Sequence, residues 1–153
     1  MRILALFLAL TVSTAAADVQ IVRVFTGWRD AGSFKRISEY FTGVENTGGQ
    51  IVVRTQPGRR AGYYFLVRTE NAGPAVEAKV VVEIVPPGPQ RSRSFTFPLR
   101  LTPGKAVFNL GVTGEDWPDA EADIVAWKLT ISSVAGEILA TEKSYLWEKP
   151  IEE

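Results

Sequence analysis

The sequence contains no histidine and no cysteine among its 153 residues. The absence of histidine excludes Ser-His-Asp and Cys-His nucleophilic mechanisms, because these mechanisms use imidazole as their base at neutral pH. The two absences together exclude His-ligated zinc and copper and thiolate-ligated metals. Disulfide bonds are excluded as well, so apolar burial and backbone hydrogen bonds must hold the fold.

Known catalytic sequence motifs are also missing. The chain has no G-x-S-x-G, no S-x-x-K, no phosphate-cradling loop and no G-x-G-x-x-G. The chemistry left for an enzyme is a carboxylate pair, for which the candidates are Asp116 or Asp119 with Glu121. We therefore expect a protein that is not an enzyme and that carries no cofactor.

An excess of charge of one sign is missing too, since 17 basic residues balance 17 acidic ones. This balance argues against a nucleic-acid binder, which would show a basic excess. The charges are nevertheless uneven along the chain: residues 18–105 hold 13 basic and 7 acidic residues, and residues 106–153 hold 3 and 10. Because strands of the two halves interleave in a sandwich, we expect charge pairing across strands. A bipolar surface that favours self-association is the alternative.

Long hydrophobic runs are absent except at the start of the chain. Met1 and Arg2 precede an apolar run over residues 3–12, and Ala15 and Ala17 before Asp18 fit the A-x-A cleavage rule. A membrane-crossing helix needs about 20 apolar residues, so this run is too short to span a bilayer. We predict that residues 1–17 are a cleaved signal peptide. The mature chain would then have no transmembrane segment and be exported, to the periplasm or outside the cell.

Strand patterns dominate from residue 18 onward. Val76, Ala78 and Ile84 belong to a clean alternation of apolar and charged residues, and Pro98, which cannot donate to a ladder, indicates an edge strand. Short strands without long intervening helices predict an all-β, antiparallel two-sheet sandwich that forms a single domain over residues 18–148, with a frayed tail at 149–153. The eight expected strands are residues 19–25, 50–55, 63–69, 76–85, 95–101, 106–112, 124–132 and 137–147.

Two details of this reading concern the N-terminal part. Alternation in the first strand places Val19, Ile21 and Phe25 on one face. In residues 33–41, Phe34, Ile37 and Phe41 share a helical face, Ser33 can cap the start and Gly43 can cap the end, which favours a short helix. The alternative is a strand with Ile37 and Phe41 inward.

The stretch from Trp127 to Thr141, WKLTISSVAGEILAT, looks like the final hairpin of a known module type: a strand, a glycine-containing turn and an apolar return strand. With it, Gly62 to Trp147 resembles bacterial immunoglobulin-like or fibronectin-III-like envelope modules. The resemblance implies a scaffold or adhesive role and no catalytic residues. The cysteine pair of antibody domains is missing here, and residues 18–50 have no counterpart in a minimal module and look like an extension.

Aromatic residues give one set of candidate binding residues. Trp28, Trp117 and Trp147 lie at loops or strand ends and are candidates for an exposed platform on which sugar rings stack; packing into the core or between segments is the alternative for each. Trp127 alternates with core residues and is expected to pack.

Charged residues give two further candidates. Asp116, Asp119, Glu121 and Asp123 form the densest acidic stretch, which is a candidate calcium site, although its spacing is not that of an EF-hand and a solvated loop is the alternative. The basic pairs Arg59-Arg60 and Arg91-x-Arg93 follow Pro-Gly turns and could meet an anionic polysaccharide or lipid headgroup; solvated turns are the alternative for both.

The sequence as a whole predicts an exported, non-catalytic module that binds another protein or has a structural role in the cell envelope. A carbohydrate-binding module that uses exposed loop aromatics is the alternative. The expected partner is thus a protein or a polysaccharide whose identity the sequence does not specify.

Overall fold

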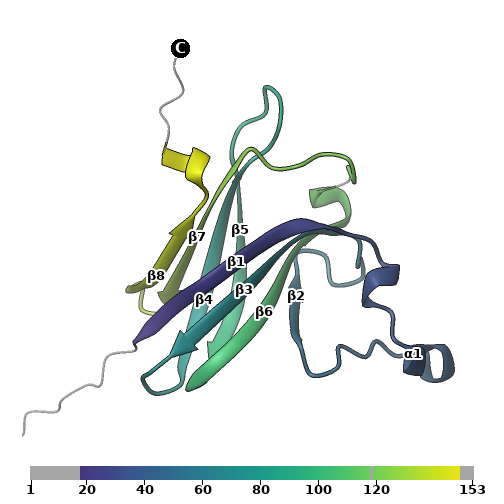
Figure 1. The fold of residues 1–153 in the computed structure, drawn as a ribbon, viewed down its shortest axis with the longest axis horizontal. Coiled ribbons are helices and arrows are strands. Elements are labelled where there is room, and N and C mark those ends of the chain that lie inside the picture. The colour runs from purple at the N-terminus through teal and green to yellow at the C-terminus, as the bar shows by residue number, and fades with distance from the viewer. Residues whose placement is uncertain (1–17, 118, 149–153) are drawn as a thin grey trace, which may run out of the picture.

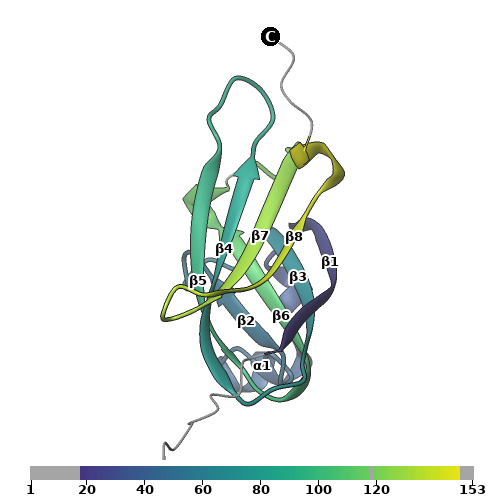
Figure 2. The ribbon, with the colours of Figure 1, turned by 90° about the vertical axis from the view of Figure 1, so that its left-hand side faces the viewer.

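A computed structural model describes residues 18–117 and 119–148, and the predictions made for residues 1–17 and 149–153 lie outside this part. Eight strands form two four-stranded sheets that lie face to face, as Figures 1 and 2 show from two directions. The first sheet has the order β1-β3-β6-β2 and the second the order β5-β4-β7-β8. The strands are β1 (Val19–Arg29), β2 (Ile51–Arg54), β3 (Gly62–Asn71), β4 (Val76–Val85), β5 (Arg93–Leu101), β6 (Gly104–Thr113), β7 (Ala126–Ser133) and β8 (Ile138–Lys143).

The topology confirms the predicted immunoglobulin-like sandwich. The strands β1, β3 and β6 share one sheet and β4, β7 and β8 share the other, which is the distribution of strands A, B, E and C, F, G in that fold. Five of the six strand pairings are antiparallel, whereas the short β2 runs parallel to β6 at the sheet edge. Pro98 lies in β5, which is an edge strand as its missing donor requires.

Alternating side chains from both sheets fill the space between the layers. The predicted strand at residues 76–85 is observed with the same bounds, and its apolar positions from Ala78 to Ile84 are buried. Fully burying a large aliphatic or aromatic side chain contributes about 1.5–3 kcal/mol, so a core of this size can hold the sandwich without disulfide bonds. The largest fully buried side chains are Phe65, Phe97, Phe108, Ile84, Leu101, Leu110, Leu129 and Ile131.

The first strand corrects one sequence expectation. A β-bulge between Ile21 and Arg23 shifts the register of β1 against β3, so that Val24 instead of Phe25 packs against the core. Phe25 is 46% exposed. Because side chains alternate with period two, one extra residue moves every later side chain to the opposite face.

The predicted extension is smaller than expected. Residues 18–50 looked like an extension without a counterpart in a minimal module, but β1 within them pairs with β3 along nearly its whole length and is a regular strand of the first sheet. The part that leaves the sandwich is residues 30–50, hereafter the excursion.

The C-terminal strands also end differently from the prediction. Trp127 packs as predicted, since it is half-buried and meets Phe65 edge-on with ring centroids 5.9 Å apart, whereas Val125, before the start of β7, is 46% exposed. The expected strand over residues 137–147 stops at Lys143, and the chain then forms the 3-10 turn η3 (Tyr145–Glu148).

The excursion contains the predicted helix in shortened form. Two separate elements replace the single helix over residues 33–41: the 3-10 turn η1 (Gly32–Phe34) and the helix α1 (Ile37–Thr42). Ser33 does not cap α1; the Glu39 carboxylate accepts the Arg36 N–H at the start of this helix. Gly43 ends it in the left-handed conformation (φ 69°), as predicted.

Within residues 18–117 and 119–148, none of the helical segments has the length and apolar character of a membrane crossing.

Candidate functional site

The excursion is the part of the chain that stands apart from the sandwich. Figure 1 shows α1 clear of both sheets, on the side where β2 forms the edge of the first sheet. Because a six-residue helix is marginal on its own, contacts with the sandwich must hold this segment in place.

One aromatic side chain anchors the excursion on the outer face of the first sheet. Phe34 is 9% exposed, and its ring centroid lies 4.6 Å from that of Tyr64. The guanidinium groups of Arg29 and Arg54 lie 4.0 and 4.9 Å from the Phe34 ring centroid, within cation–π range. Phe34 is therefore held among three side chains from β1, β2 and β3.

Tyr64 makes this outer face a second, smaller core. Its ring covers Gly111 of β6, where a Cβ atom would come within 2.5 Å of the ring. The Tyr64 hydroxyl accepts a hydrogen bond from Arg54 Nε (2.7 Å) and donates one to the Arg60 carbonyl (2.6 Å). Both neighbouring tyrosines of β3 are thus buried, Tyr63 inside the sandwich and Tyr64 beneath the excursion.

Two two-point ion pairs, linked by a longer contact between Arg60 Nε and the Glu45 carboxylate (3.6 Å), tie the far end of the excursion to the sandwich. Arg60 contacts both carboxylate oxygens of Glu39 (2.7 and 3.2 Å), and Arg54 contacts both oxygens of Glu45 (2.7 and 2.9 Å). The hydrogen bond from Arg60 lowers the pKa of Glu39, and the hydrogen bond from Arg54 lowers the pKa of Glu45, in each case against an opposing effect of desolvation. Both glutamates are therefore ionised at neutral pH, and two-point contacts fix their orientation.

The excursion so held presents large apolar side chains to solvent. Ile37, Tyr40, Phe41 and Val44 are 78%, 71%, 84% and 68% exposed, and we call these four residues the apolar crest. The spacing i, i+3 and i+4 places Ile37, Tyr40 and Phe41 along one side of α1, and Val44 follows the left-handed Gly43 that ends the helix. The favoured prediction of a helix with Ile37 and Phe41 on one face is confirmed, and the alternative, a strand with both residues inward, is wrong.

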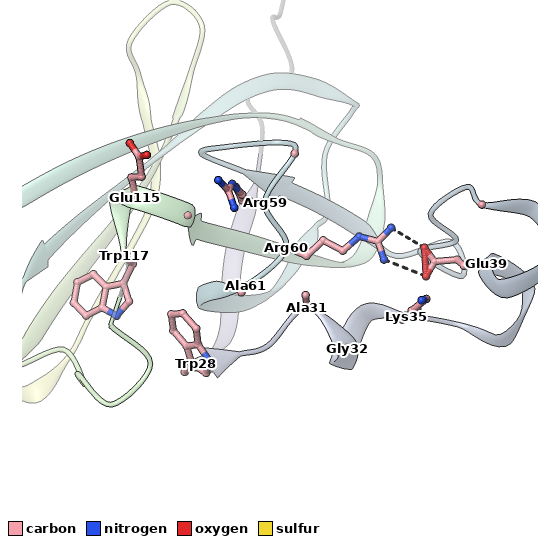
Figure 3. A pocket seen from close by; sticks show the side chains of 13 residues that line it. Trp28, Ala31, Gly32, Lys35, Glu39, Arg59, Arg60, Ala61, Glu115 and Trp117 are labelled. Atoms are coloured by element: carbon pink, nitrogen blue, oxygen red, sulfur yellow. Dashed lines mark hydrogen bonds and ion pairs between the residues drawn. The ribbon is translucent and has the colours of Figure 1, made fainter.

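A groove of about 890 Å³ lies between the excursion and the adjoining end of the sandwich (Figure 3). Its walls come from the end of β1, the excursion, the β2–β3 loop and the chain after β6. The lining residues are Trp28, Ala31, Gly32, Lys35, Glu39, Gly43, Gly58, Arg59, Arg60, Ala61, Gly114, Glu115 and Trp117.

The groove contains ionic groups that the protein does not neutralise. Within the described part of the chain, neither the Arg59 guanidinium nor the Glu115 carboxylate makes an ion pair or a side-chain hydrogen bond, and both residues are exposed. Lys35 lies over the Tyr40 ring at 4.1 Å, while Arg60 is engaged by Glu39. The groove is therefore polar at its rim, with one cation and one anion available to a ligand.

The three candidate tryptophans do not form one exposed platform. Trp28 and Trp117 line the groove, whereas Trp147 lies in η3 and does not. Trp117 is only 4% exposed and packs on Tyr63, with ring centroids 5.4 Å apart. Its Nε1 has no hydrogen-bond partner in the described part of the chain, and Figure 3 shows this atom on the edge of the ring nearer Trp28.

The candidate calcium residues do not converge. Asp116 lies beside Arg93 (3.7 Å), Asp119 accepts the backbone N–H of Glu121, and Asp123 accepts hydrogen bonds from the Tyr63 hydroxyl and the Ile124 N–H. Burial raises the pKa of Tyr63 to about 12, and the hydrogen bond to Asp123 adds to this effect. Across residues 18–117 and 119–148, no group of three or more acidic side chains is arranged to hold a metal ion.

Each of the two basic pairs contains one engaged and one unengaged arginine. Arg60 and Arg93 are each paired with a carboxylate, whereas neither Arg59 nor Arg91 makes an ion pair or a side-chain hydrogen bond within residues 18–117 and 119–148. Sequence reasoning found Arg59 and Arg60 but missed Lys35, Glu39 and Glu115 as groove residues. No local pattern marks these residues, because the excursion brings them together from distant parts of the chain.

No protein-family model and no curated protein sequence matches the chain. Among solved structures, the chain is similar to an immunoglobulin-like protein of Pseudomonas aeruginosa, with 18% identity over 82% of this chain and 93% of that one and a TM-score of 0.37.

Proposed function

We propose that this protein is a non-catalytic protein-binding module and that the apolar crest is its contact surface. The observation that carries the proposal is the exposure of Ile37, Tyr40, Phe41 and Val44 on a segment that ion pairs and a buried phenylalanine hold in place. A clustered apolar surface in contact with water is unfavourable, and such patches mark interaction sites in soluble proteins.

The geometry of the crest favours a partner with an apolar groove. Ile37, Tyr40 and Phe41 stand at i, i+3 and i+4, which are among the anchor positions by which a helix docks into a hydrophobic groove. Phe41 and Tyr40 are the largest of the four, and fully burying an aromatic side chain contributes about 1.5–3 kcal/mol. Because the helix is fixed before binding, little ordering entropy opposes association.

The basic residues next to the apolar crest indicate the charge that the partner should carry around its apolar groove. Lys35 and Arg36 precede α1, and no ion pair within the described residues engages either of them. The acidic neighbours Glu39 and Glu45 are neutralised by Arg60 and Arg54. The partner groove should therefore be apolar at its centre and acidic at its edge.

Site-specific crosslinking in the native host tests this proposal. A photoreactive amino acid at position 41 should capture one dominant partner, and the same amino acid at Val134, which is 74% exposed in the β7–β8 turn, should not. The purified partner should then lose at least tenfold in affinity for Phe41→Asp and change less than threefold for Val134→Asp.

Three outcomes would contradict the proposal. The first is equal capture from both positions, and the second is equal affinity of both aspartate variants. The third is a shift from dimer to monomer in Phe41→Asp without any heterologous partner, which would make the crest a self-association surface. Circular dichroism of both variants checks that the sandwich is intact.

A second candidate function, carbohydrate binding, is favoured by a separate observation. The groove holds the half-buried Trp28 indole ring next to free polar groups, which suits a ligand with an apolar ring face and a polar rim. A glycan screen that compares the wild-type protein with Trp28→Ala tests carbohydrate binding. No binding to any neutral or acidic glycan would contradict this candidate function.

We further propose that the protein acts after export. The support is the sequence of residues 1–17, with its basic start, ten-residue apolar run and small residues before Asp18. N-terminal sequencing of the protein from its host should begin at Asp18, and an N-terminus at Met1 would contradict export by this route.

A further inference from the structure

The groove of about 890 Å³ has a composition that selects among ligands. We propose that it binds an acidic sugar, a pyranose ring that carries a carboxylate, as in a uronate. This inference rests on the second candidate function, carbohydrate binding, and adds the charge of the ligand and the residue that recognises it.

Arg59 is the group that would recognise the carboxylate. Its side-chain stem passes beside Gly114, where a Cβ atom would lie 2.9 Å from Arg59 Cγ, so the sandwich supports the base of the side chain. The guanidinium at its end has no acidic partner in the described part of the chain, although Glu115 lines the same groove. Guanidinium and carboxylate groups match in a two-point hydrogen-bond geometry, which makes arginine selective for this ligand group.

The remaining polar groups fit the hydroxyls of a sugar. Glu115 offers a free carboxylate that accepts hydrogen bonds, and Lys35, whose ammonium lies over the Tyr40 ring at 4.1 Å, would have to leave that ring to donate from the opposite wall. A sugar hydroxyl both donates and accepts, so it can pair with either group. A purely anionic ligand without donors, such as sulfate, would leave Glu115 unpaired and repelled.

The indole rings supply the apolar surface. Trp28 is half-buried and lines the groove, so part of its ring is available to the face of a pyranose. Beneath it, the Trp117 N–H is buried without an acceptor, which costs about 1–3 kcal/mol. A ligand oxygen brought to this N–H would recover that cost. Neighbouring atoms cover Nε1 in this structure.

Tryptophan fluorescence titration with matched trisaccharides tests the inference. The probes are trigalacturonate and its neutral counterpart, galactotriose, at two salt concentrations. We expect the acidic trisaccharide to bind at least tenfold more tightly and to weaken with added salt, because a charge pair is screened by ions. An acetylated tripeptide with a free C-terminal carboxylate is the third probe and should not bind.

Two variants and one control locate the site. Arg59→Gln should weaken trigalacturonate binding at least tenfold, and Trp117→Phe, which keeps an aromatic ring but removes the N–H, at least threefold. Arg91→Gln, at an exposed arginine in the β4–β5 loop outside the groove, should change it less than twofold.

The outcomes separate the inference from the function on which it rests. Equal binding of the two trisaccharides, lost in Trp28→Ala, would overturn the acidic selectivity but keep carbohydrate binding. Binding of neither sugar would overturn both. Binding of the tripeptide alone, or an Arg59→Gln variant that behaves like Arg91→Gln, would also overturn the inference.

Discussion

Replacing Phe34 by alanine should release the excursion from the sandwich. The Phe34 side chain is 9% exposed and lies 4.6 Å from the Tyr64 ring and 4.0 and 4.9 Å from the guanidinium groups of Arg29 and Arg54. The substitution therefore removes one buried ring and two cation–π contacts in a single step. The apolar crest and the groove wall would lose their support together.

The expected loss of unfolding free energy follows from this environment. Truncating a buried phenylalanine to alanine costs 3–5 kcal/mol in a closed core. Phe34 packs on the outer face of the first sheet instead, where water can fill the cavity left by the ring and the excursion can move closer to the sheet. The loss of unfolding free energy should therefore be near the lower end of this range, about 3 kcal/mol. If the excursion can detach from the sandwich without global unfolding, and if this detachment costs less than about 3 kcal/mol, the loss of global unfolding free energy is limited to the free energy of detachment.

Urea denaturation and amide hydrogen exchange together measure this effect. The backbone amides of Gly43 and Gln50 donate to the backbone carbonyls of Glu39 (2.8 Å) and Thr47 (3.2 Å). These amides report on the excursion and should exchange faster in Phe34→Ala. The matched control is Phe25→Ala, since Phe25 also lies near two arginines but is 46% exposed, and it should cost less than about 1 kcal/mol. Equal losses in the two variants, with unchanged exchange at Gly43 and Gln50, would refute the anchoring role of Phe34.

Three further predictions concern the outer face, acid and alkali. Gly111→Ala places a Cβ atom 2.5 Å from a tyrosine ring and should lower the unfolding free energy by about 1–3 kcal/mol, whereas Gly27→Ala, with no atom within 4 Å, should change it by less than about 0.5 kcal/mol in urea titrations. The pKa values of Glu39 and Glu45 are lowered, so their ion pairs stabilise the folded state fully above pH 4.5, and this stabilisation is lost as the pH falls through the lower folded-state pKa values. Carbon-detected NMR titration should show both carboxyl groups titrating below pH 4.5. Ordinary pKa values for these two groups would contradict the pairing. Because the pKa of Tyr63 is raised to about 12, its burial contributes stability that is present below pH 10 and lost as the pH rises toward 12. The absorbance of ionised Tyr63 should therefore appear only at the pH at which the protein begins to unfold. A normal titration of Tyr63 near pH 10 would contradict its burial.

The regular strands of the sandwich were predictable because period-two patterning and burial coincide. Residues 76–85 show this most clearly, since every second side chain is apolar and the strand bounds are those expected. The bulge in β1 was not predictable, because a single extra residue leaves no compositional signal and yet reverses the facing of Phe25. The local pattern therefore predicts where a strand lies more reliably than it predicts on which side of the sheet each side chain lies.

The candidate site was far less predictable than the fold. Ile37 and Phe41 have the spacing of a core-facing helix, and the sequence contains nothing to say that their side chains point away from the sandwich. Trp117 looked like a loop aromatic and is nearly fully buried. The ion pairs of Glu39 and Glu45 join residues 21 and 9 positions apart, and only the path of the excursion brings these charges together.

The most direct test of the account is whether the apolar crest is exposed on a folded excursion in solution. NMR relaxation by a soluble gadolinium chelate, measured at isoleucine methyl groups, gives this answer without a partner. We predict strong relaxation at Ile37, which is 78% exposed, and little at Ile84 and Ile131, which are fully buried, together with proton–proton contacts between Phe34 and Tyr64. Protection of Ile37 equal to that of Ile131, or the absence of contacts between the Phe34 and Tyr64 rings, would contradict the account.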